Sequence, residues 1–179
     1  MRSHTSGSYN VTAGYQSGFY LTTADECVLI GSQAGVNITT GSKNIAMGSN
    51  ALFTATTAAD NTGIGHHALR YSTTASGNVA VGAFAGDAIT TGGSNTTVGH
   101  ESASALTTGT VNTAVGRQSL YQCTTGEANA CFGEAAGHQI TTGDNNACLG
   151  RDSGTSNSPV HITTGDNIVC LGNNSTTDL

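Results

Sequence analysis

The chain has 179 residues, a formal net charge of −6 and only 9% charged side chains, so its surface must consist mainly of Ser, Thr, Asn and Gly. Aromatic residues make up 5% and Trp is absent, which argues against a conventional globular core. The five Lys and Arg residues are scattered, so no nucleic-acid partner is expected. The apolar clusters are far shorter than the roughly 20 residues of a membrane-spanning helix, so no membrane insertion is expected.

One short motif recurs along the whole chain. Its most typical copy is Asn112-Thr113-Ala114-Val115-Gly116, and the glycines that close the copies stand at 14, 31, 48, 65, 82, 99, 116, 133, 150 and 172. The interval is 17 residues throughout, except for the last, which is 22. A fixed short period is the signature of a solenoid and predicts one repeat domain over residues 1–179.

Each unit follows the same order of residue types. A small residue comes three positions after the closing glycine, and an apolar residue such as Leu106 usually comes seven positions after it. A Thr-Thr pair and a Gly or Ala turn follow. Seventeen residues hold two strands of about five residues and two tight turns, but not a helix and a strand. We therefore predict an all-β fold, a two-sheeted parallel β-solenoid of about ten 17-residue coils.

Asparagine recurs four residues before the closing glycine. Asparagine side chains stacked at the strand spacing can form hydrogen bonds along the stacking axis. The members of this predicted ladder are Asn10, Asn44, Asn61, Asn78, Asn95, Asn112, Asn129 and Asn146.

Alternate residues of a strand point to opposite sides, and neither side of this motif is polar enough to face water. The side with Asn, Ala and Gly suits a narrow coil interior. The other side carries the apolar residue just before each glycine, and such a stripe on a rod marks a protein interface. We expect a homo-oligomer, with a trimer favoured. The expected oligomer core is Ile30, Met47, Ile64, Val81, Val98, Val115, Phe132, Leu149 and Leu171.

The Asn-x-Ala-Val-Gly strand with its Thr-Thr-Gly turns, most typical at residues 107–117, resembles the head repeats of YadA-like trimeric autotransporter adhesins. It looks still closer to the longer-period repeats of bacteriophage tail and head fibres. The resemblance implies a left-handed parallel β-roll, three chains side by side and a role in adhesion. A cell-surface glycan or protein is the expected receptor. The 17-residue period is longer than that of the adhesin heads, and no signal peptide, stalk or membrane anchor is visible. These features favour a virion fibre over a secreted adhesin, although an extracellular surface location stays open.

No catalytic residue, metal site or cofactor is predicted. The stretch 150–154 is similar to a serine-nucleophile loop, but Ser153 fills a column that holds Ala or Ser in every unit. No Ser-His-Asp or Cys-His arrangement occurs at a defined spacing. Cys131, Cys148 and Cys170 share one column, where free cysteine is a common small buried residue; disulfides or a metal ladder are the alternatives.

The period breaks once, at a five-residue insertion within residues 155–161. Insertions in solenoids form loops on one face, and these loops often bind partners; a neutral loop is the equal alternative. The residues of this candidate contact loop are Ser156, Asn157, Ser158, Pro159 and His161.

These observations lead us to expect a non-enzymatic fibre segment that serves attachment. The alternative is a subunit of a self-assembling extracellular filament, because the repeats show no capping unit and open solenoid ends expose strand edges. A weaker alternative is an ice-binding solenoid, suggested by the Thr-Thr array. Adjacent threonines point to opposite faces, however, so only one rank of them can face outward.

Overall fold

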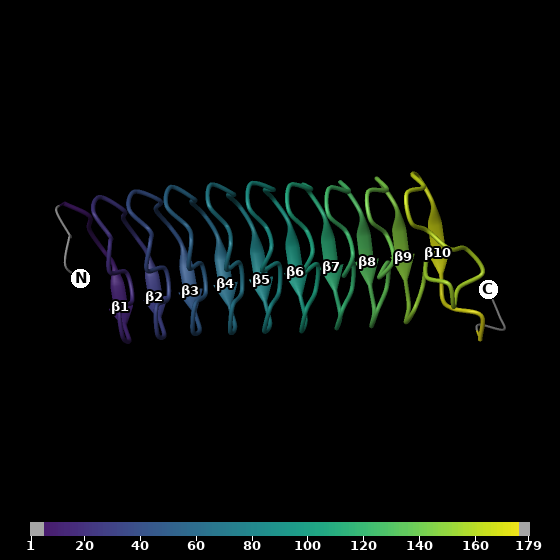
Figure 1. Cartoon of the computed structure of the whole chain (residues 1–179), viewed down its shortest axis with the longest axis horizontal. Coiled ribbons are helices and arrows are strands. Elements are labelled where there is room, and N and C mark those ends of the chain that lie inside the picture. The colour runs from purple at the N-terminus through teal and green to yellow at the C-terminus, as the bar shows by residue number, and fades with distance from the viewer. Residues whose placement is uncertain (1–5, 176–179) are drawn as a thin grey trace.

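The computed structural model describes residues 6–175, so residues 1–5 and 176–179 of the predicted domain lie outside the described residues. The chain winds into a row of similar coils, with its two ends at opposite ends of the rod (Figure 1). Each coil adds one strand to a single ten-stranded parallel sheet in the order β1 to β10, which confirms the predicted all-β parallel β-solenoid. The described residues contain no helix that could cross a membrane. The strands are β1 (Val11–Ala13), β2 (Val28–Ile30), β3 (Ile45–Met47), β4 (Thr62–Ile64), β5 (Val79–Val81), β6 (Thr96–Val98), β7 (Thr113–Val115), β8 (Ala130–Phe132), β9 (Ala147–Leu149) and β10 (Val169–Leu171).

The register of the sheet follows the 17-residue repeat. Val115 pairs with Phe132 in the next strand, and Phe132 pairs with Leu149. Equivalent residues therefore stack in columns along the rod. The inner columns are narrow and fully buried, with Ala114 on the strand side and Leu106 on the opposite side.

The second sheet that we predicted is not present among the described residues. The segment that returns after each strand is a series of turns, because residues such as Gln118 and Leu120 adopt left-handed φ values near 55° and interrupt any extended run. The coils are still joined on this side. The backbone N–H of Leu120 donates to the carbonyl of Ala136 (2.9 Å), and that of Thr124 donates to Thr141 (2.8 Å).

The closing glycine is required by the close approach of neighbouring coils. Gly116 has a φ of 135°, and a Cβ built on it would lie 2.3 Å from the carbonyl oxygen of Gly133 in the next coil. Any side chain here would collide with backbone, and the φ value itself disfavours residues with a Cβ. The same close approach to a carbonyl of the next coil occurs at the closing glycines from Gly14 to Gly133 and explains glycine at these positions.

The predicted asparagines lie inside the coils, where they hydrogen-bond from one coil to the next. Asn112 Oδ1 accepts from the backbone N–H of Asn129 (3.0 Å) and from its Nδ2 (3.1 Å). Asn112 Nδ2 also donates to the carbonyl of Gly126 (2.8 Å). The same Asn-to-Asn link joins every consecutive pair from Asn44 to Asn146.

Asn10 lies in the same column but is cut off from the other asparagines. The second coil has Cys27 at this place, and Asn10 Oδ1 accepts from the backbone N–H of Cys27 (2.9 Å). The Cys27 thiol approaches the carbonyl of Gly41 at 3.5 Å. Gly41 belongs to the third coil, and a thiol is a weak donor and a weak acceptor. The junctions on both sides of Cys27 therefore lack the amide-to-amide bond found from Asn44 to Asn146.

Replacing Asn112 with alanine leaves the buried N–H of Asn129 and the carbonyl of Gly126 without these partners. We expect the free energy of unfolding to fall by about 1–3 kcal/mol for each buried polar group left unpaired. Urea unfolding followed by circular dichroism measures the change. Thr125→Ala, at an exposed position of the same coil, is the matched control and should alter stability little. Equal stability of the two variants would contradict a stabilising role for the ladder.

Val111 occupies an unfavourable backbone conformation. Residues five positions before the closing glycine are left-handed in every coil; Val111 has a φ of 61° and is 60% exposed. A β-branched residue rarely adopts this conformation, whereas asparagine tolerates it, as at Asn145 and Asn167. We expect Val111→Asn to raise the free energy of unfolding by about 1 kcal/mol. Val111→Thr removes the exposed apolar surface but keeps the β-branch, so it should give no comparable gain.

Candidate assembly and contact surfaces

The outer face of the sheet carries an apolar stripe that no other layer of the described residues covers. The residues just before each glycine point outward, while their strand neighbours such as Leu29 and Ala46 are fully buried inside the coil. Val81, Val98 and Val115 are half-buried. The larger members of the predicted oligomer core are 36–45% exposed: Ile30, Met47, Ile64, Phe132, Leu149 and Leu171.

A second outward column lies beside the first, at the start of each strand. It contains Val28, Ile45 and Val79 together with threonines and alanines, all partly or largely exposed. Neither column contains a charged residue. The outer face is therefore two columns wide, apolar to weakly polar, and continuous from β1 to β10. We call it the outer sheet face.

The insertion folds over the last coil. Ser158 is 7% exposed; its hydroxyl lies 2.7 Å from the Cys170 thiol and donates to the carbonyl of Gly172 (3.2 Å). The backbone N–H of Asn174 donates to the carbonyl of Asn157 (2.7 Å). These contacts cover the interior of the end coil, so the expectation that the repeats have no capping element is wrong at this end.

The candidate contact loop therefore divides into two parts. Ser158 faces inward and is structural. Ser156, Asn157, Pro159 and His161 are exposed and remain available to a partner. Ser156 is held through its backbone N–H, which donates to Gln139 Oε1 (2.7 Å).

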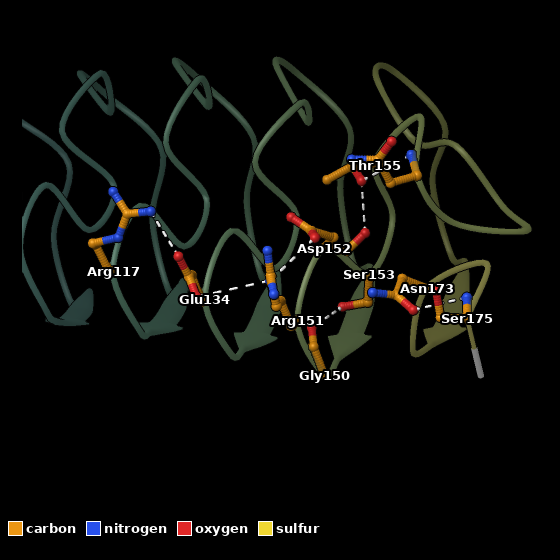
Figure 2. Close-up of polar contacts among 10 residues, drawn as sticks. Arg117, Glu134, Gly150, Arg151, Asp152, Ser153, Thr155, Asn173 and Ser175 are labelled. Atoms are coloured by element: carbon orange, nitrogen blue, oxygen red, sulfur yellow. Dashed lines mark hydrogen bonds and ion pairs between the residues drawn. The ribbon is translucent and has the colours of Figure 1, made fainter.

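A row of charged side chains runs beside this loop on consecutive coils (Figure 2). Arg117 donates to Glu134 Oε1 (2.6 Å), and Arg151 lies 3.8 Å from the other oxygen of Glu134 and 3.3 Å from Asp152. The hydrogen bond from Arg117 lowers the pKa of Glu134, and the pKa of Arg117 is raised in turn. The row borders an open cavity of about 280 Å³ that reaches His138 and Asn157. Because the pairs are exposed, salt screens them, and they suit reversible polar contacts better than stabilisation of the fold.

Ser153 is fully buried, and its hydroxyl donates to the carbonyl of Gly150 (2.8 Å) (Figure 2). This places it in the packing column expected from the repeat. Among residues 6–175, no group of three or more His, Cys, Asp or Glu side chains is arranged to hold a metal ion.

The cysteines are free thiols and all are buried. Cys148 pairs in register with Cys131 on one side and with Cys170 on the other. A hydrogen bond to Cys148 and burial raise the pKa of the Cys131 thiol, and burial raises the pKa of Cys123 to about 11. The hydrogen bond between the two thiols lowers the pKa of Cys148 in turn. Because the three thiols of the column are buried and inaccessible, they are poor nucleophiles and pack the interior.

The two threonines of each pair differ in their surroundings. The first hydroxyl donates to the backbone of the next coil, as from Thr107 Oγ1 to the carbonyl of Thr124 (2.9 Å). The second threonine, such as Thr108 or Thr125, is exposed. One threonine rank therefore faces outward along the rod.

A cluster of rings at the positions just after the closing glycine was not predicted from the sequence. His66 stacks on His67 with ring centroids 3.8 Å apart, and the Phe84 ring meets both edge-on. The signal was present in the 17-residue register, because His67 and Phe84 occupy the same place in adjacent units.

Comparison of the sequence with protein-family models, curated proteins and solved structures finds no match. The function is therefore argued from the surfaces described above.

Deleting residues 157–161 restores the 17-residue interval and removes the cover over Cys170. We expect the coils to persist and Cys170 to react with a thiol reagent at least tenfold faster, while Cys148, one coil deeper, stays protected. Mass spectrometry of the labelled protein assigns the reactive residue. The same deletion combined with Cys170→Ala is the control and should show no fast labelling. An unchanged rate at Cys170 would mean that the insertion does not cap the end coil.

Proposed function

We propose that the chain is a structural and adhesive fibre segment, a rigid homo-oligomeric rod that mediates attachment, with a trimer favoured and a phage tail or head fibre as its setting. The observation that carries the proposal is the outer sheet face, which is apolar, uncharged and uncovered over ten strands.

The outer sheet face supports self-association because partial exposure of many apolar side chains is costly in water. Complete burial of a Val, Leu or Ile side chain contributes roughly 1.5–3 kcal/mol relative to full exposure. The column repeats at every coil, so identical chains placed side by side can cover one another over their full length. Soluble single chains rarely expose a continuous stripe of this kind.

Attachment would then use the other sides of the rod. The turn segments after each strand carry residues that vary from coil to coil, and the exposed part of the insertion lies beside the charged row of Arg117, Glu134 and Arg151. Variable, polar and hollowed surfaces suit receptor contact, whereas the outer sheet face suits copies of the same chain.

A self-assembling filament is the second candidate, because β1 and β10 each have only one neighbouring strand within the described sheet. Strand edges of this kind invite pairing with another chain. The insertion lies over the C-terminal coil and weakens this alternative, although the edge of β10 remains. An ice-binding solenoid has less support, because only one threonine rank faces outward.

Light scattering on the purified protein tests the proposal through its particle mass. We expect the mass of a small, closed oligomer, three chains in the favoured case, and we expect Val98→Asp to reduce it to one chain without changing the circular dichroism spectrum. The aspartate would bring like charges into an apolar interface.

Thr125→Asp introduces the same charge on the exposed threonine rank and should leave the mass unchanged. A wild-type protein that stays monomeric at high concentration would contradict the fibre proposal. A mass that grows with concentration, with long filaments in electron micrographs, would favour the filament.

A further inference from the structure

An open cavity of about 450 Å³ lies across the turn segments that follow β5, β6 and β7. The middle segment contributes two short side chains, Ser104 and Ala105, while the flanking segments contribute Asp87 and Tyr121. Short side chains between longer ones create the hollow. Its walls come from turn residues and not from strand residues, so it is separate from the outer sheet face.

Two aromatic rings line this cavity, and histidines hold both in place. Phe84 meets His66 edge-on, with ring centroids 5.2 Å apart, and Tyr121 stacks on His138 at 5.0 Å. Packed rings lose little conformational freedom when a ligand binds, so they form ready-made contact surfaces.

Two carboxylates line the same cavity, which no Lys or Arg lines. Glu101 is held by a hydrogen bond from Gln118 Nε2 (2.7 Å). Asp87 takes part in none of the ion pairs found among the described residues, although it is half-buried. The arrangement leaves a partly desolvated negative site in which Asp87 has no ion-pair partner among the described residues, while His100 lies 3.6 Å from Glu101.

The neighbouring coil shows how this side of the rod accommodates an organic cation. The guanidinium of Arg70 lies 5.0 Å from the centroid of the Tyr71 ring and 5.9 Å from that of Phe53. Arg70 thus rests against rings and makes no ion pair with Asp87 within the described residues. Rings and carboxylates around one hollow, as at Phe84 and Tyr121, are the features that recognise quaternary ammonium groups.

We propose that the cavity binds an alkylammonium ion, with its alkyl groups against Phe84 and Tyr121 and its positive charge facing Asp87 and Glu101. The inference deepens the attachment function, on which it rests for its biological meaning, by naming the chemistry of the receptor group. The binding itself uses one chain and requires no oligomer.

The affinity should depend on pH through Asp87. Burial raises the pKa of Asp87 to about 6, an effect to which Glu101 adds and which Arg70 and the backbone amides of Asp87 and Ala88 oppose. Above this pKa the carboxylate is charged and attracts the cation; as the pH falls through it, protonation removes that charge. Binding should therefore be strong at pH 7.5 and weak at pH 5. His100 lies 3.6 Å from Glu101, the second carboxylate of the cavity.

Isothermal titration with choline tests the site, and 3,3-dimethylbutan-1-ol, which has the same shape without the charge, is the ligand control. We expect choline to bind with a dissociation constant of about 1 mM or lower and the neutral analogue to bind at least tenfold more weakly. Asp87→Asn and Tyr121→Ala should each weaken choline binding at least tenfold, while Tyr121→Phe, which keeps the ring, should retain it. The matched controls are Asp60→Asn and Tyr15→Ala, exposed residues remote from the cavity, which should bind as the wild type does.

Three results would overturn the inference: no choline binding at 10-fold above the expected dissociation constant, equal binding of the neutral analogue, or binding of a neutral sugar such as galactose in place of choline. Circular dichroism of each variant separates lost binding from lost fold. A protein that is monomeric but binds choline would refute the fibre proposal and support the alkylammonium site. A trimer that does not bind choline would support the fibre proposal and refute the site.

Discussion

The solenoid depends on hydrogen bonds to two buried backbone groups at the corner before each strand. There the backbone N–H of one coil and the carbonyl of the next turn point into the interior, where water does not reach. The amide of Asn112 supplies an acceptor to Asn129 and a donor to Gly126, so one side chain satisfies both. An apolar residue would leave both groups unpaired, and a carboxylate would bring a charge into the core. This requirement accounts for asparagine in eight of the ten coils; Cys27 and Ile168 occupy the position in the other two.

The sequence predicts the sheet well because its strand residues repeat in a strict register. Asn112, Ala114 and Gly116 each have one equivalent per coil, so alternation and spacing assign them to the interior. The returning segment was predicted less well. Leu120 adopts a left-handed φ that nothing in a leucine indicates; closure of a narrow coil imposes it. The contact between Ser158 and Cys170 could not be predicted from the sequence either, because it occurs once and lies outside the repeat.

The columns divide the chain into positions that cannot change and positions that can. Gly116 and Asn112 are determined by contacts with the next coil, so they carry no chemistry of their own. The positions just after the glycine face outward and hold His67, Phe84 or Glu101 in successive coils. Chemically different side chains can therefore be placed side by side on a fixed framework. The ring cluster and the charged row arise at these variable positions, and Phe84 and Glu101 contribute one part of the cavity lining from them.

Because the coils touch only their neighbours in sequence, the junctions between them act in series under tension along the rod. Such a series breaks at its weakest junction, whatever the strength of the other junctions. The junctions from Asn44 to Asn146 share the amide-to-amide bond. Between the second and third coils the Cys27 thiol, 3.5 Å from the carbonyl of Gly41, stands in place of the asparagine amide. A fibre pulled from both ends would therefore part first between the second and third coils. The later coils would keep their register, with the outer sheet face intact from β3 to β10.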